Sequence, residues 1–309
     1  MHCSKLTHDD EFWLNDGTIV LVCQTIGFRV YRELLAHQSP VFANMLESST
    51  PSSEESYQGL PVVQLSDSPT DLRHFLGALL PKRHILCAEC SYLSRMLIDK
   101  LFIAATIRLA HKYDVSSLLL QALEPLKEYY AVTFDEWCNP HARYALSVDT
   151  RSCAIAAVNL ARLTDTPSVL PLALYDCCLL GSAILDGWQN EDGVTEHLNT
   201  ADLRLCLDAR ERLAQKNVLA FFSVYAVAVE VECRNRSGCE KTLRGMVQAG
   251  QAGVGKCEIL VDLLLPHPPM CDACERALAG RARLERRRLW ERLPEILGVE
   301  VDRWDAIVS

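Results

Sequence analysis

Strand-forming sequence is confined to the first 65 residues of this chain, and this uneven distribution limits the folds that it can adopt. Three short runs rich in β-branched and aromatic residues, at 18–23, 28–31 and 61–65, have the length and composition of strands. The segment 24–27 predicts a hairpin turn between the first two. From about residue 133 onward, the apolar residues follow helical spacing. The sequence therefore predicts an α+β protein with a small sheet near its start and a mainly α-helical remainder.

Helix starts can be placed from serine–proline pairs and from apolar periodicity. Ser39-Pro40 and Ser68-Pro69 each put a capping serine before a proline at the first helical position. The polar segment 50–59 between these helices is predicted to be a loop. The other predicted helices span residues 97–113, 119–130, 152–163, 171–185, 200–216, 217–232, 254–265 and 272–290.

Charge and hydropathy argue against nucleic-acid and membrane partners. The formal net charge is −9, which disfavours binding to phosphate-rich surfaces. An arginine-rich stretch at 276–292 is interpreted as the solvated face of a helix that docks through Leu284, Leu289 and Trp290. The most apolar run, 218–229, is shorter than the roughly 18–20 residues that a membrane-spanning helix needs.

Cysteine usage indicates an intracellular protein. The chain has 14 cysteines, and its first residues do not resemble a secretory signal. We therefore expect reduced thiols or metal ligands rather than disulfides, in a cytoplasmic or nuclear protein.

The order of the predicted elements in the first half resembles that of the BTB/POZ domain. Three segments carry the resemblance: DGTIVLVCQTIGFRVYRELLAHQSPVFANML (16–46), PVVQLSDSPTDLRHFLGALL (61–80) and RLAHKYDV (108–115). The chain is most similar to a large group of fungal, basidiomycete-type BTB/POZ proteins, whose tail motif WERLP is matched at 290–294. The resemblance implies a BTB/POZ domain over 1–131, with its core at 12–131, and a helical C-terminal domain over 132–309. Two departures are Tyr31, where the family usually has histidine, and 81–95, which does not match a fourth strand.

The resemblance implies protein–protein recognition rather than catalysis. We expect a scaffold that forms homo-oligomers through the BTB/POZ domain in regulatory or transcriptional complexes. In dimerising members, an acidic and a basic residue lie in a charged pocket at the dimer groove, and Asp16 and Arg32 match these positions. The alternative for this pair is a turn residue and a solvated helix-start residue, which would contribute little.

A substrate adaptor of a cullin-type ubiquitin ligase is the alternative function. Such adaptors often carry a hydrophobic-x-acidic element after the helix that corresponds to 69–80, and the acidic residue is missing from Leu80-Pro81-Lys82-Arg83. An enzyme has less support, because the nine histidines are scattered and no nucleophile elbow or phosphate loop is found.

Four late cysteines are the candidate metal ligands. Cys271 and Cys274 have the C-x-x-C spacing that lets two thiolates bind one ion. Cys233 and Cys239 are the candidate second pair, and Cys257 and His267 are spare candidates. The predicted cofactor is a structural zinc ion near the end of the C-terminal domain. The alternative is that these are reduced cysteines that pack as small apolar residues. A second C-x-x-C at Cys87 and Cys90 is weaker, because no further pair lies near it in sequence.

Overall fold

The chain forms two compact units in a computed structural model, and each unit is described by itself. The first comprises 1–129, 160–165 and 188–196, and the second comprises 130–159, 166–187 and 197–309. The protein is α+β. A domain boundary near residue 131 stays a prediction. The structure describes residues 6–48, 56–80, 100–130, 133–138, 153–190, 192–226, 229–250, 255–260, 264, 267–302 and 304.

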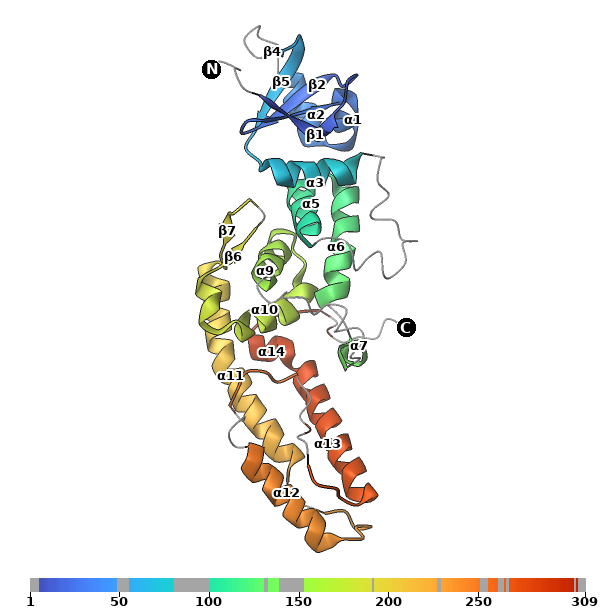
Figure 1. Ribbon diagram of the computed structural model, residues 1–309, viewed down its shortest axis with the longest axis vertical. Helices are drawn as coiled ribbons and strands as arrows, with labels where there is room; N and C mark the ends of the chain where they lie inside the picture. The colour runs from blue at the N-terminus through green and yellow to red at the C-terminus, as the bar shows by residue number, and fades with distance from the viewer. Residues whose placement is uncertain are drawn as a thin grey trace. The chain divides into compact units, whose positions relative to one another are not determined.

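A five-stranded sheet lies at one end of the first unit (Figure 1). Its strands are β1 (Thr7–Trp13), β2 (Ile19–Cys23), β3 (Ile26–Val30), β4 (Ser56–Tyr57) and β5 (Leu60–Leu65), in the order β1-β3-β2-β5-β4. Strands β2 and β3 form an antiparallel hairpin, and β5 and β1 pair in parallel with β2 and β3, respectively. The three predicted strands are confirmed. The hairpin turn is shorter than predicted, because β3 already begins at Ile26.

The described helices of the first unit are α1 (Arg32–Gln38), α2 (Pro40–Ser48), α3 (Pro69–Leu79), α5 (Lys100–Lys112) and α6 (Ser116–Tyr130). Both predicted serine caps are confirmed. Ser39 Oγ accepts a hydrogen bond from the N–H of Phe42 at 3.0 Å, and Ser68 Oγ accepts from Thr70 and Asp71. The buried faces of β2, β3 and the helices share one apolar core, in which the rings of Phe42 and Tyr113 stack at 4.3 Å.

Strands β1 and β4 were missed because their sequences are polar. In β1, only Asp9 and Phe12 are buried, and the Asp9 carboxylate is held by Arg73 of α3 at 2.8 Å. The same carboxylate accepts hydrogen bonds from the backbone N–H groups of Glu11 and Phe12, at 3.0 and 2.9 Å. A buried aspartate is an unusual inward residue for a strand, and its partner lies 64 positions away in sequence.

Gly27 on β3 leaves room for the side chains of Leu6 and Trp13 to lie close to the sheet. His8 stacks on Trp13 with ring centroids 3.5 Å apart, and Tyr57 meets Trp13 edge-on. Beneath these rings, a Cβ atom on Gly27 would lie 2.8 Å from Cδ2 of Leu6 and 3.2 Å from the Trp13 ring. The close approach therefore requires a residue without a side chain.

Replacing Gly27 by valine is expected to lower the free energy of unfolding of the first unit by about 1–2 kcal/mol, because Leu6 and Trp13 must move. Urea denaturation followed by circular dichroism measures this. The control is Gly245→Ala in helix α12 (Arg236–Gly250), where a Cβ meets nothing within 4 Å and alanine favours the helix. If Gly27→Val is as stable as the wild type, the packing over Gly27 does not exclude a side chain at this position.

The first unit also takes in a short hairpin from much later in the chain. Strands β6 (Trp188–Gln189) and β7 (Thr195–Glu196) pair antiparallel. Arg108 of α5 binds the carboxylates of both Asp71, at 3.2 Å, and Glu196 of the hairpin. The expectation that strands end in the first half is therefore wrong for this hairpin, whose two-residue strands are too short to show alternation.

The second unit is mainly helical. The predicted helices 152–163 and 272–290 are confirmed as α9 (Ala154–Leu163) and α13 (Asp272–Glu291). The predicted helix 171–185 is shorter, because α10 (Leu170–Leu179) is flanked by the 3₁₀ turns η1 (Pro167–Val169) and η2 (Gly181–Leu185). The described part of the unit also contains the short helices α7 (Phe134–Cys138) and α14 (Leu293–Leu297), together with α11 (Thr200–Val224) and α12.

Three predictions for the second unit are wrong. The predicted helices 200–216 and 217–232 are one helix, α11 (Thr200–Val224); Asn217 lies within it, and its amide donates to the carbonyl of Lys256 at 2.9 Å. Helix α12 was missed because 234–238 looks like a break, whereas Asn235 Oδ1 caps it by accepting from the N–H of Gly238. Of the predicted helix 254–265, the described part 255–260 is not helical.

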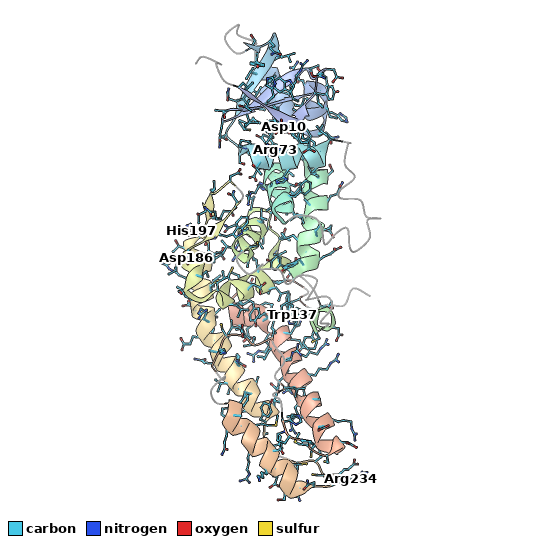
Figure 2. The ribbon with its side chains drawn as sticks, viewed as in Figure 1. Asp10, Arg73, Trp137, Asp186, His197 and Arg234 are labelled. Carbon is cyan, nitrogen blue, oxygen red and sulfur yellow. The ribbon has the colours of Figure 1, made fainter. Side chains whose placement is uncertain are left out.

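The WERLP segment forms an aromatic cluster in the second unit. Trp290 is fully buried, and its ring lies 5.6 Å from that of Trp137 and 5.1 Å from that of Trp304. The ring of Phe134, on the same helix as Trp137 (labelled in Figure 2), also contacts that of Trp290. The prediction that α13 docks through Leu289 and Trp290 is confirmed. It is wrong for Leu284, which is exposed.

The arginines of α13 are largely engaged in ion pairs. Arg283 binds Asp135 at 2.9 Å, and Arg281 lies 3.7 Å from Glu230. Arg288 pairs with Glu285 along the helix. Surface pairs of this kind contribute about 0–1 kcal/mol each to stability. Their main effect is therefore to offset the positive charge of the arginine-rich stretch. Across the described part of the chain, no helix combines the length and apolar character needed to cross a membrane.

Candidate metal centre

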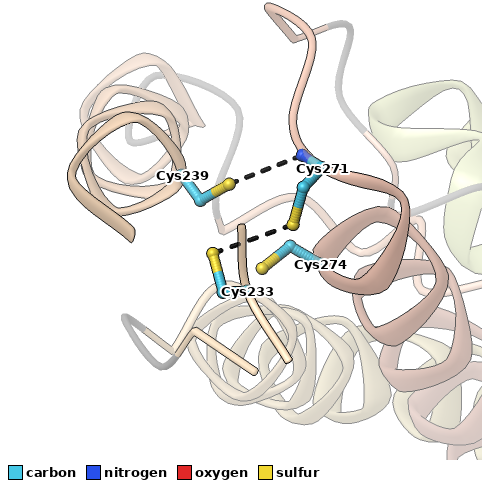
Figure 3. Close-up of side chains that lie close together, drawn as sticks. All are labelled: Cys233, Cys239, Cys271 and Cys274. Atoms are coloured by element: carbon cyan, nitrogen blue, oxygen red, sulfur yellow. Dashed lines mark hydrogen bonds between the residues drawn. The ribbon is translucent and has the colours of Figure 1, made fainter. Parts of the chain in front are cut away.

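Four cysteines from two parts of the sequence meet in the second unit (Figure 3). The Sγ atoms of Cys233, Cys239, Cys271 and Cys274 all lie within 4.8 Å of one another. These are the four residues that the sequence analysis proposed. The two spare candidates lie elsewhere: the Cys257 thiol donates to the carbonyl of Cys178, and Nδ1 of His267 lies against the carbonyl of Pro268.

Each cysteine pair brackets the start of a helix. Cys233 lies in the turn after α11, and Cys239 is in the first turn of α12. Cys271 is the N-cap residue of α13, with an extended backbone, and Cys274 follows in the first turn. The sulfur of Cys271 lies 3.7 Å from that of Cys233.

The surroundings of the sulfurs act in both directions. Burial raises the pKa of Cys274 to about 12, and the pKa of Cys239 is also raised although the N–H of Cys271 acts against this, whereas helix starts and backbone N–H groups favour thiolates. The N-terminus of a helix carries a partial positive charge, and two such ends meet at this cluster. The backbone N–H of Cys271 points at Sγ of Cys239 at 3.5 Å (Figure 3). The backbone N–H of Cys274, with that of Arg234, lowers the pKa of the Cys271 thiol to about 6.

Burial makes unpaired thiolates costly at this position. Cys239 and Cys274 are almost fully buried, and Cys233 and Cys271 are partly buried. A buried anion without a compensating positive charge is strongly unfavourable. All four cysteines are free, and the separation of 3.7 Å between Cys233 and Cys271 is far from the roughly 2.05 Å of a disulfide bond. The arrangement thus resembles a ligand set more than a redox pair.

A second group of cysteines was not singled out from the sequence. Cys177, Cys178 and Cys206 lie fully buried on α10 and α11. The Cys178 thiol donates to the carbonyl of Cys206 at 3.5 Å, and the Cys206 thiol donates to the carbonyl of Leu174. The thiols of Cys178 and Cys206 are satisfied by the backbone, and we interpret the three buried cysteines as small packing residues. Cys87 and Cys90 lie outside the described residues.

The predicted charged pair of the first unit has other partners within the chain. Asp16 accepts a hydrogen bond of 2.8 Å from the hydroxyl of Tyr31, and this bond raises the pKa of Tyr31. Nη2 of Arg32 donates to the carbonyl of Leu46 at 2.9 Å. Both Asp16 and Arg32 are exposed. The role of Asp16 and Arg32 in partner binding stays a prediction. The hydroxyl of Tyr31, at the usual histidine position, is satisfied by its hydrogen bond to Asp16.

Comparison of the chain with models of known protein families, with curated proteins and with solved structures finds no match. The function must therefore be argued from the fold and the described side chains.

Proposed function

We propose that this chain is a protein-interaction scaffold that self-associates through a BTB/POZ-type first unit. The supporting observation is the order and pairing of its elements. The antiparallel hairpin β2–β3 is followed by α1 and α2, then by β5, which returns parallel to β2, and then by α3, α5 and α6. This is the succession that the sequence resemblance implies for a BTB/POZ domain.

The exposed charges beside the hairpin are the proposed partner contacts. Asp16 lies in the short turn between β1 and β2, and Arg32 begins α1, so neither residue is on a long loop. Each already makes one hydrogen bond, which limits the side-chain freedom lost on binding. Exposed, pre-positioned charges are suited to setting the register and specificity of an interface.

Multi-angle light scattering of the full chain over a range of concentrations tests the proposal. We expect twice the mass of a single chain, and we expect Asp16→Ala and Arg32→Ala each to raise the dimer dissociation constant roughly tenfold. Asp10→Ala is the matched control, because Asp10 is an exposed carboxylate of the same unit, on β1 (Figure 2). A strict monomer at every concentration would overturn self-association and make a cullin-binding assay the next experiment.

A further inference from the structure

We propose that Cys233, Cys239, Cys271 and Cys274 bind one Zn²⁺ ion in a closed, structural site that ties the start of α12 to the start of α13. This inference goes beyond the scaffold proposal and does not depend on it, because the site lies in the second unit. It rests on the geometry, the burial and the chemistry of the four sulfurs.

The spacing of the sulfurs fits a single tetrahedral ion. A zinc–sulfur bond of about 2.3 Å in a tetrahedron places the sulfurs about 3.8 Å apart. The distance between the sulfurs of Cys233 and Cys271 is 3.7 Å, and the largest separation in the group is within 4.8 Å. A two-iron or four-iron cluster would need its thiolates farther apart, because the inorganic core stands between them. The cluster therefore has room for one ion.

The ligand type selects the metal. Thiolates are soft ligands that favour zinc or iron over magnesium and calcium, which prefer oxygen. Four protein ligands fill the tetrahedron and leave no position for a water or a substrate, which is the arrangement of structural rather than catalytic zinc. The two helix N-termini and the N–H of Cys271, aimed at Sγ of Cys239, offset the charge of four thiolates around a divalent ion.

The position of the site indicates which helix the ion would hold in place. Helix α12 buries only four residues, Cys239, Leu243, Met246 and Gly250, and one of these is a proposed ligand. Such a small apolar face is a weak anchor for a helix of 15 residues. By contrast, α13 is anchored at its far end by Leu289 and Trp290. We therefore infer that the ion docks α12, and that its loss frees α12 while the aromatic cluster persists.

Elemental analysis of the full chain, purified without added metal, is the direct test. We expect about one zinc per chain and little iron, and Co²⁺ exchanged into the site should give the intense visible absorption of a tetrahedral thiolate complex. Cys239→Ser and Cys274→Ser should each reduce the zinc content at least roughly tenfold. The matched control is Cys138→Ser on α7, a partly exposed cysteine outside the cluster, which should keep its zinc.

Hydrogen exchange on the wild-type chain separates a structural ion from a surface-bound one and needs no variant to fold. After removal of the metal with a strong chelator, amides of 233–250 should exchange at least roughly tenfold faster, while those of 285–297 should change little. Three results would overturn the proposal: a wild-type chain that neither contains zinc nor takes up cobalt, one equivalent of iron in place of zinc, or unchanged exchange in α12 after zinc removal.

Discussion

Replacing Trp290 by alanine is expected to lower the free energy of unfolding of the second unit by about 4 kcal/mol, the largest effect of any single substitution considered for this chain. Trp290 is 0% exposed, and its ring meets those of Phe134, Trp137 and Trp304. Removing the indole would leave a large cavity among three aromatic rings, two on α7 and one at Trp304, which limits how far the site can collapse.

Two comparison variants separate packing from hydrogen bonding at this site. The indole Nε1 of Trp290 makes no hydrogen bond within the described part of the chain. Trp290→Phe therefore breaks no such bond and should cost only about 1–2 kcal/mol for the smaller ring. Phe222→Ala on α11 is the exposed aromatic control, since Phe222 is 50% exposed, and it should stay within about 0.5 kcal/mol of the wild type. Thermal and urea unfolding followed by far-ultraviolet circular dichroism measures all three.

A decrease of less than about 1 kcal/mol in the free energy of unfolding for Trp290→Ala would contradict the packing described for the WERLP segment. Removing a fully buried tryptophan from a close-packed interior destabilises a protein by more than that. The carbonyl of Trp290 gives a second readout, since it accepts the indole N–H of Trp304 at 2.8 Å. A disordered cluster in Trp290→Ala should release Trp304 into water and shift its fluorescence to longer wavelength.

Replacing Asp9 by alanine is expected to lower the free energy of unfolding of the first unit by about 3 kcal/mol. The side chain of Asp9 is 0% exposed, and three donors depend on it: the guanidinium of Arg73 and the N–H groups of Glu11 and Phe12. Alanine would leave the buried N–H of Phe12 without its acceptor. The side chain of Arg73 is 37% exposed, so its charge can reach water and adds less to the cost.

The neighbouring aspartate gives a matched control for Asp9. Asp10 has the same side chain on the same strand but is exposed, and Asp10→Ala should change stability by less than about 0.5 kcal/mol. Asp9→Asn keeps an oxygen for the two backbone donors and should cost less than Asp9→Ala. Arg73→Ala should also destabilise the unit, because it leaves the buried carboxylate without its positive partner. Equal stability of Asp9→Ala and Asp10→Ala would show that the buried carboxylate contributes nothing.

The elements that could be predicted from the sequence are those whose signals are local. The hairpin β2–β3 has an apolar run on each side of its turn, and the starts of α2 and α3 have a capping serine followed by proline. Strand β1 carries Asp9, which is acceptable inside only because Arg73 lies opposite it in the fold. Asn217, the first residue of the predicted helix 217–232, lies within α11, where the carbonyl of Lys256 satisfies its amide. In both cases, a distant partner overrides the local preference.

The candidate metal ligands also divide into a pair that local spacing predicts and a pair that depends on the fold. The pair Cys271 and Cys274 has a spacing that points to metal binding by itself. Cys233 and Cys239 are separated by five residues, a loose spacing that left Cys257 and His267 as competitors. What selects between them is the start of α12, which was not predicted and which carries Cys239 to within reach of α13. The ligand set thus depended on a helix whose first residues, 236–238, look like a turn.

The hairpin β6–β7 has a consequence for how the chain is made. Glu196 completes the carboxylate pair around Arg108, and the hydroxyl of Ser68 donates to Asp192 of the same hairpin. A ribosome releases the first 130 residues well before these late partners exist. During that interval, the guanidinium of Arg108 has the carboxylate of Asp71 but lacks that of Glu196. The first unit therefore reaches its final set of contacts only after α10 of the second unit has been synthesised. The order of synthesis thus interleaves the formation of the two units.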